Sequence, residues 1–120
     1  MGGAVGAGRE RRSAVGPVTA RVCSLSELPE GTARSFEVDG RSVCVARCAD
    51  GLHAIDDVCS HEDYPLSEGD VDAAACEIEC WRHGSLFSLH TGEALTLPAT
   101  RSVAVHQIEV QGDDVLVTLR

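Results

Sequence analysis

The 120-residue chain is long enough for one domain and too short for two domains that each bury a core. Nineteen acidic residues against ten arginines and no lysine leave a formal net charge of −9, which argues against nucleic-acid binding. No apolar stretch approaches the length of a membrane-spanning helix. Aromatic residues make up only 3% of the chain. We therefore expect an aliphatic, β-branched core, which suits strands better than helices.

The chain begins with a Gly-, Ala- and Arg-rich stretch, residues 1–17, which we expect to be a disordered tail. This stretch lacks the continuous apolar segment of an export signal. We therefore expect a cytoplasmic protein, in which cysteines are reduced thiols or metal ligands.

Short β-type runs punctuated by turn residues follow this stretch. Asp39-Gly40 is a two-residue hairpin signal, and Asp50-Gly51 and Gly112-Asp113 mark two further turns. The predicted strands cover residues 21–25, 33–38, 41–48, 52–55, 75–80, 86–89, 102–110 and 115–119. No stretch long enough for a helix shows the 3.6-residue hydrophobic period of an α-helix. The sequence therefore predicts an all-β domain with a loop-rich insert near its middle.

The insert carries two short motifs, each with a cysteine and a histidine close together. One residue separates Cys59 from His61, and two residues separate Cys80 from His83. Two sulfur and two nitrogen ligands suit either a zinc ion or an iron–sulfur centre. Zinc ligands usually have about two to four residues between them. The tighter spacing fits a binuclear cluster better, with the Cys of each loop on one iron and the His on the other.

The pattern C-x-H followed by C-x-x-H-G resembles the Rieske signature, in which two histidines replace two cysteines on one iron of a [2Fe–2S] cluster. The resemblance covers roughly residues 19–120 and extends to segments 65–69, 91–92 and 97–99. It implies a Rieske-type antiparallel β-sandwich or barrel base within a domain of residues 18–120. A cluster-binding subdomain of about residues 57–98 is inserted into this base.

The resemblance also implies roles for individual side chains. Cys59 and Cys80 are expected to hold the inner iron, and His61 and His83 the outer iron near the surface. Ser85 matches a hydroxyl that hydrogen-bonds a bridging sulfide in high-potential members of the family. The remaining neighbours expected around the cluster are Trp81, Gly84 and Pro98.

This sequence departs from the respiratory Rieske proteins at several positions. Phe87 stands where the high-potential members have a second donor, a tyrosine hydroxyl. Tyr64 and Arg82 occupy the positions of two cysteines that form a disulfide between the cluster loops. With one donor lost and acidic loops nearby, we expect a reduction potential toward the low end of the Rieske range, roughly −150 to +300 mV.

The four remaining cysteines are expected to be small buried residues rather than ligands. Cys44 and Cys48 lie about 13 Å apart along one strand, too far to form a disulfide with each other, which needs less than ~7 Å. Cys76 shares a face with Cys80 and is expected to pack beneath the cluster, while Cys23 is expected to be a core or half-buried strand residue. Three histidines without a paired donor are expected to have surface or satisfied roles: His53, His90 and His106.

The resemblance implies a Rieske ferredoxin that moves single electrons from a flavin-dependent ferredoxin reductase to a terminal non-haem iron oxygenase. We find no glycine-rich phosphate loop and no free nucleophile with a base, so we expect no catalysis by this chain alone. Three alternatives stay open: the small subunit of an assimilatory nitrite reductase, an accessory redox module in iron–sulfur assembly or sensing, and a structural zinc module. Four acidic residues form either a docking surface or an ordinary solvated loop: Glu62, Asp63, Glu68 and Asp70.

Overall fold

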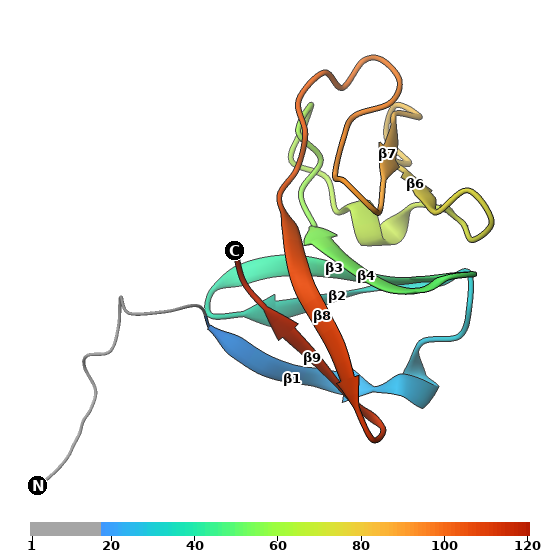
Figure 1. Cartoon of the computed structure of the whole chain (residues 1–120). Helices are drawn as coiled ribbons and strands as arrows, with labels where there is room; N and C mark the ends of the chain where they lie inside the picture. Colours follow the sequence, from blue (N-terminus) through green and yellow to red (C-terminus); the bar gives the residue numbers. More distant parts are fainter. Residues whose placement is uncertain (1–17) are drawn as a thin grey trace, which may run out of the picture.

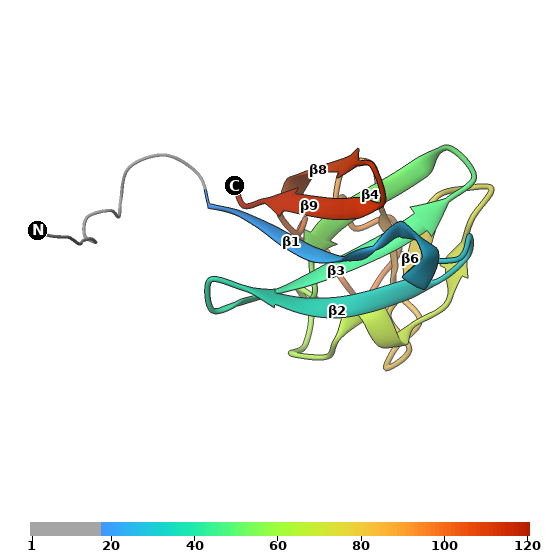
Figure 2. The same ribbon diagram turned by 90° about the horizontal axis from the view of Figure 1, so that it is seen from below.

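A computed structural model of the chain describes residues 18–120, so the expected tail of residues 1–17 lies outside the described part. A six-stranded antiparallel sheet in the order β1-β9-β8-β4-β3-β2 forms the base (Figures 1 and 2). Its strands are β1 (Thr19–Ser24), β2 (Ala33–Val38), β3 (Arg41–Cys48), β4 (Gly51–Asp56), β8 (Val105–Gln111) and β9 (Asp114–Thr118). The edge strands β1 and β2 also contact each other, which makes the sheet a nearly closed barrel.

The segment between β4 and β8 forms a second, smaller layer above one end of the barrel in Figure 1. It contains a three-stranded sheet in the order β5-β6-β7. The strands are β5 (Val71–Asp72), β6 (Glu77–Glu79) and β7 (Leu86–Ser88). Two 3₁₀ turns complete the fold, η1 (Leu25–Glu27) between β1 and β2 and η2 (Leu66–Glu68) before β5. Across residues 18–120, the structure contains no helix that is long and apolar enough to span a bilayer.

Strand β3 joins the two layers because it is buried on both faces. Val43 and Val45 point into the core of the barrel, whereas Cys44 and Ala46 belong to the core beneath the small sheet. Alternate residues of a strand point to opposite faces, so an unbroken apolar run here supplies both cores. Packing across β3 therefore fixes the small sheet on the barrel.

The predicted all-β class and most of the predicted strands are confirmed. The β2–β3 hairpin has the predicted bounds, and Asp39 and Gly40 both have positive φ, as a tight two-residue turn requires. The strand predicted from residue 102 begins at Val105, and the two-residue strand β5 was not predicted.

A disulfide between Cys48 and Cys76 corrects the prediction that both residues are reduced thiols. Cys48 ends β3, and Cys76 directly precedes β6, 28 residues later in the chain. The small sheet folds back over the end of β3 and brings their Cα atoms to 5.3 Å. The prediction considered only pairing along one strand and had no means of detecting this contact between layers. Cys23, Cys44, Cys59 and Cys80 are buried free thiols.

Candidate metal centre

Two loops of the inserted segment carry the cysteine–histidine motifs, and both close in the same way. The backbone N–H of Cys59 donates to the carbonyl of Tyr64 at 2.9 Å, and that of Cys80 donates to the carbonyl of Ser85 at 2.8 Å. In the second loop, Gly84 adopts a φ of +80° while its N–H donates to the carbonyl of Cys80 at 2.8 Å. This left-handed conformation favours glycine. Each loop thus holds its cysteine at the base, where chain entry and exit meet.

The two motif cysteines lie together in the interior. Cys59 is 3% exposed and Cys80 is 1% exposed, and their thiols are within hydrogen-bonding reach of each other. Burial raises the pKa of the Cys80 thiol, whereas hydrogen bonds from the backbone N–H groups of Arg82 and His83 lower it. Such N–H groups stabilise negative charge on sulfur, which is what a thiolate ligand requires.

The two motif histidines lie together at the surface. The ring centroids of His61 and His83 are 5.3 Å apart, and both residues are exposed. His83 Nε2 lies 2.8 Å from Glu62 Oε2, and this hydrogen bond lowers the pKa of the Glu62 carboxyl. Because Nε2 is engaged by Glu62, Nδ1 is the nitrogen of His83 that remains for a metal.

The donors pair by type and do not converge on one point. Ligand atoms of His61, Glu62 and His83 lie within 4.8 Å of one another, and neither thiol belongs to this set among the residues of the described part. A structural zinc ion needs four donors around a single centre, at about 2.0–2.3 Å from the metal. Buried sulfurs and exposed imidazoles instead fit a centre with two metal ions. The donor set therefore fits a [2Fe–2S] cluster.

Ser85 is buried next to Cys80 in the second loop. Its hydroxyl oxygen accepts a hydrogen bond from the backbone N–H of Ala99 at 3.0 Å, which fixes the 97–99 loop to the motif. Phe87 is fully buried in the core beneath the small sheet and offers no polar group there. Of the other expected neighbours, Gly84 and Pro98 are half-buried.

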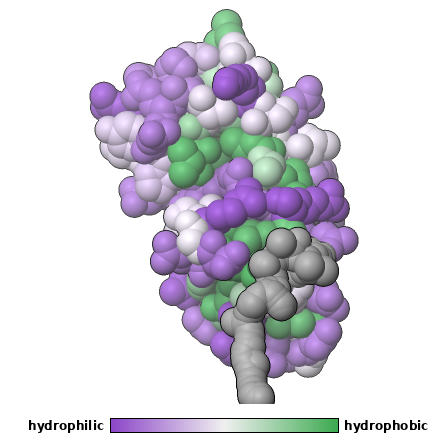
Figure 3. Space-filling model, turned by 90° about the vertical axis from the view of Figure 1, so that its left-hand side faces the viewer, coloured by the Kyte–Doolittle hydropathy of each residue, from purple (hydrophilic) through white to green (hydrophobic). Residues whose placement is uncertain are grey.

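Two exposed hydrophobic side chains belong to the second motif loop and to the 97–99 loop that Ala99 ties to Ser85. Trp81 is 52% exposed and Leu97 is 77% exposed. Figure 3 shows a small hydrophobic area at the tip of the molecule, at the end where Figure 1 places part of the segment between β7 and β8, and larger hydrophobic areas further down the same face. The predicted acidic surface is only partly free. Glu62 is engaged by His83, whereas Asp63, Glu68 and Asp70 are exposed.

A stack of side chains connects the two loops where respiratory Rieske proteins have a disulfide. The guanidinium of Arg82 lies over the Tyr64 ring at 5.2 Å from its centroid, and Trp81 packs edge-on against the same ring at 5.2 Å. Arg82 Nε is also 3.7 Å from Glu62 Oε1. A cation–π contact and an ion pair thus join the loops without a covalent bond.

Sequence reasoning missed a second group of potential ligands, which surrounds the Cys48–Cys76 disulfide. Asp50, His53 and His90 converge there through hydrogen bonds between their side chains. His90 and His53 come from different layers of the fold, and neither lies in a recognisable motif. The one local signal in this region is the predicted turn at Asp50-Gly51, which follows Cys48 closely.

Comparison with known proteins agrees with this geometry. The family model described as the Rieske [2Fe-2S] domain matches residues 18–112. The ferredoxin component of biphenyl 2,3-dioxygenase from Rhodococcus jostii is 34% identical over 99 residues, covering 82% of this chain and 91% of the relative. The solved ferredoxin of carbazole 1,9a-dioxygenase from Nocardioides aromaticivorans is 35% identical with a TM-score of 0.82, covering 86% of this chain and 99% of that chain.

Two further solved structures bear on partners and on the fold. A complex of reduced oxygenase and oxidized ferredoxin in carbazole 1,9a-dioxygenase matches at 34% identity and a TM-score of 0.77, covering 83% of this chain and 92% of that chain. A chain from Mycobacterium tuberculosis described as a nitrite reductase small subunit is 23% identical with a TM-score of 0.78, covering 87% of this chain and 96% of that chain. This last likeness concerns the fold alone. The family model covers most of the chain and its donor groups are in place, so the chain belongs to the Rieske [2Fe–2S] domain family.

Proposed function

We propose that Cys59 and Cys80 hold one iron of the [2Fe–2S] cluster and that His61 and His83 hold the other. The pairing of buried thiols and exposed imidazoles supports this assignment. When bound, the cluster supplies reversible one-electron transfer. The backbone N–H groups of Arg82 and His83 stabilise the thiolate of Cys80. The loop closures at both cysteines hold the ligands in place before the cluster is inserted.

We further propose that the chain is a cytoplasmic ferredoxin that carries electrons singly to a terminal non-haem iron oxygenase. The observation that carries this proposal is the exposure of both histidines, together with that of Trp81 in the same loop as His83. An electron acceptor must approach the metal centre closely, and the imidazole edges are where a partner reaches it. The exposed side chains of Trp81 and Leu97 provide apolar area for a short-lived contact.

The partners follow from the relatives and from what the chain lacks. Similar ferredoxins serve biphenyl and carbazole dioxygenases, and one of them is solved in complex with its oxygenase, which supports an oxygenase as acceptor. The sequence contains no glycine-rich nucleotide loop. We infer that a separate flavin-dependent reductase supplies this chain with single electrons.

Ligand substitutions test the assignment. Cys80→Ala is expected to abolish stable cluster assembly, and Cys59→Ala is expected to do the same. His83→Cys is expected to shift the spectrum toward that of an all-thiolate cluster and to lower the potential. Iron, sulfide and EPR measurements on the purified proteins check these outcomes. The control is Cys23→Ala, which removes a buried thiol in the barrel core and should retain the cluster. A full iron complement with an unchanged EPR signal in Cys80→Ala would overturn the assignment.

Electron delivery tests the function. The reduced protein is mixed anaerobically with an oxidised aromatic-ring oxygenase, and the two cluster spectra are followed by stopped flow. We expect reoxidation of this chain within the turnover time of the oxygenase. A parallel experiment uses the large subunit of an assimilatory nitrite reductase. Electron transfer to that subunit alone would overturn the proposed acceptor.

A further inference from the structure

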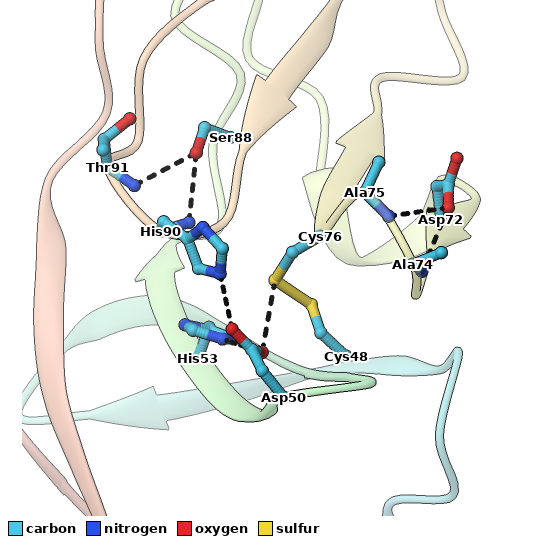
Figure 4. Close-up of a disulfide and its surroundings, with 10 residues drawn as sticks. All are labelled: Cys48, Asp50, His53, Asp72, Ala74, Ala75, Cys76, Ser88, His90 and Thr91. Atoms are coloured by element: carbon cyan, nitrogen blue, oxygen red, sulfur yellow. Dashed lines mark hydrogen bonds and ion pairs between the residues drawn. A yellow bond between two sulfur atoms is a disulfide. The ribbon is translucent and has the colours of Figure 1, made fainter.

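A second group of metal-binding side chains lies at the joint between the barrel and the small sheet, outside the Rieske motif (Figure 4). Cys48 ends β3, Asp50 lies in the following turn, and His53 lies in β4. Cys76 precedes β6, and His90 follows β7. We call these five residues the joint group.

The donor atoms of the joint group are close together. One ligand atom from each of Cys48, Asp50, His53 and Cys76 lies within 4.8 Å of the others. His53 Nε2 is 2.8 Å from Asp50 Oδ1, and Cys76 Sγ is 3.9 Å from the same oxygen. Asp50 thus stands between an imidazole and the two sulfurs, as Figure 4 shows.

His90 fixes the orientation of the carboxylate. Its Nε2 lies 2.7 Å from Asp50 Oδ2, and its ring packs edge-on against the ring of His53 with centroids 4.7 Å apart. The two imidazoles therefore bind one oxygen each. These two hydrogen bonds hold the carboxylate in one orientation, with Oδ1 on the side of the sulfurs.

The redox state of the two cysteines decides what this arrangement can bind. In the disulfide the sulfurs are neutral and are poor metal ligands. Reduction gives two thiols, and their thiolate forms place two negative charges beside the carboxylate of Asp50. Three like charges within 4.8 Å repel one another unless a cation lies among them. Thiolate, imidazole and carboxylate are the ligands that zinc takes in proteins.

We propose that the joint group binds one zinc ion when the Cys48–Cys76 disulfide is reduced. Cys48, Cys76, His53 and Asp50 are its ligands, with zinc taking the place of the hydrogen bond between His53 and Asp50. His90 is a positioning residue that donates to the second oxygen of Asp50. In the reduction step, a dithiol gives two electrons and two protons to the disulfide and becomes a disulfide itself. Zinc then displaces the two thiol protons.

The proposed site would hold the two layers together in both redox states. Cys48, Asp50 and His53 belong to the β3–β4 hairpin of the barrel, whereas Cys76 and His90 flank strands β6 and β7 in the smaller layer. The disulfide joins these layers covalently, and zinc would join them again through ligands from both sides. Loss of the covalent bond would therefore not release the layer that carries the Rieske motif.

Equilibrium dialysis of the cluster-loaded protein against zinc chloride tests the proposal. The disulfide is reduced with a phosphine, which takes oxygen from water while two electrons and two protons pass to the sulfurs. Elemental analysis then gives zinc and iron per chain. We expect about one zinc after reduction, unchanged iron, and no zinc above background without the phosphine. Zinc uptake with an equal loss of iron would place zinc at the Rieske motif and overturn the proposal. Equal zinc uptake without the phosphine would overturn the claim that zinc binds only after the disulfide is reduced.

Variants identify the ligands. Cys48→Ser and Cys76→Ser should abolish uptake, and Cys23→Ser should retain it because that thiol lies in the barrel core. His53→Gln and Asp50→Asn change partly exposed side chains and guard against misfolding of the cysteine variants. Each should weaken binding at least tenfold, and His90→Gln should weaken it about tenfold, as outer partners of ligands do. Parental zinc affinity in reduced His53→Gln would overturn the proposed ligand set.

Discussion

The hydroxyl of Ser85 has an engaged oxygen and a free proton. The oxygen accepts from the backbone N–H of Ala99 at 3.0 Å, which leaves the O–H directed elsewhere in a buried loop beside Cys80. If the proton goes to a cluster sulfide, the bond is stronger in the reduced state, because negative charge on sulfide rises on reduction. Such a bond raises the reduction potential.

Ser85→Ala is therefore expected to lower the midpoint potential while leaving the iron content intact. A difference on the order of 1–2 kcal/mol between redox states corresponds to roughly 40–90 mV for one electron. The matched control is Ser60→Ala in the first loop, because Ser60 Oγ already donates its proton to the carbonyl of Arg101. Redox titration of the three proteins checks the prediction. A shift below about 15 mV would leave Ser85 only the role of holding Ala99.

Glycine at position 69 allows the chain to pass directly beside β6. A Cβ atom there would lie 1.6 Å from the carbonyl oxygen of Glu79, although Gly69 itself has an ordinary φ of −88°. The backbone N–H of Glu79 also donates to the carbonyl of Asp70 at 2.9 Å. This close approach fixes the end of β6 one residue before Cys80, so the constraint on Gly69 is steric and lies next to the motif.

Gly69→Ala is expected to push β6 away and to destabilise the fold by about 3 kcal/mol, near the upper end of the usual effect of overpacking. Iron content should fall as well, because the displaced segment leads into Cys80. Gly112→Ala is the comparison. It has a positive φ of 64° and open space around it, so it should cost only about 1–2 kcal/mol. Urea unfolding followed by circular dichroism measures both, and equal losses with full iron content would contradict the argument.

The turn η1 gives the barrel a stability that depends on pH. Glu27 accepts from the backbone N–H of Ser24 at 2.9 Å and pairs with Arg34 at 3.0 Å, and in that order these contacts lower the pKa of its carboxyl. A group with a lowered pKa stabilises the fold above its unfolded pKa, about 4.3 for Glu. This contribution is lost as the pH falls through the lower folded pKa.

Glu27→Gln is therefore expected to lower the Tm slightly at pH 7, and this difference should shrink as the pH falls below about 4.3. The glutamine amide keeps an oxygen that can accept from the backbone N–H of Ser24, but it has no charge to pair with Arg34. The variant therefore lacks only the stabilisation that comes from the ionised carboxylate. Melting curves of parent and variant between pH 3 and 7 check this difference. A gap between the two proteins that is as large at pH 3 as at pH 7 would show that the charge is not its cause.

Local patterns predicted the elements that depend on neighbouring residues. Asp39-Gly40 located the β2–β3 hairpin because both positions adopt the left-handed backbone that this turn needs. The Cys-x-His and Cys-x-x-His spacings predicted the candidate metal centre because each motif places one cysteine and one histidine in a single short loop. The Cys48–Cys76 bond could not be predicted in this way. It depends on how the small sheet folds over the end of β3, and no short-range signal encodes this arrangement.

The distribution of polar and apolar groups over the whole molecule separates two uses of its surface. The chain carries a net charge of −9, which keeps it apart from other acidic proteins and favours a basic partner. Glu62 contributes less to this field than the sequence suggested, because it is bonded to His83 and lies near Arg82. The exposed side chain of Leu97 instead offers apolar area for contact with a partner. Leu97 contacts little of its own protein, since 77% of it is exposed.

Leu97→Ser is expected to raise the KM of a partner oxygenase for this protein about fivefold, as loss of about 1 kcal/mol at an interface would do. The kcat and the midpoint potential should not change, because Leu97 is not among the proposed ligands. The matched control is Val110→Ser, which removes an exposed hydrophobic side chain from β8 of the barrel. Steady-state turnover with varied ferredoxin measures both variants. Equal KM values for Leu97→Ser and Val110→Ser would show that Leu97 is not where the oxygenase docks.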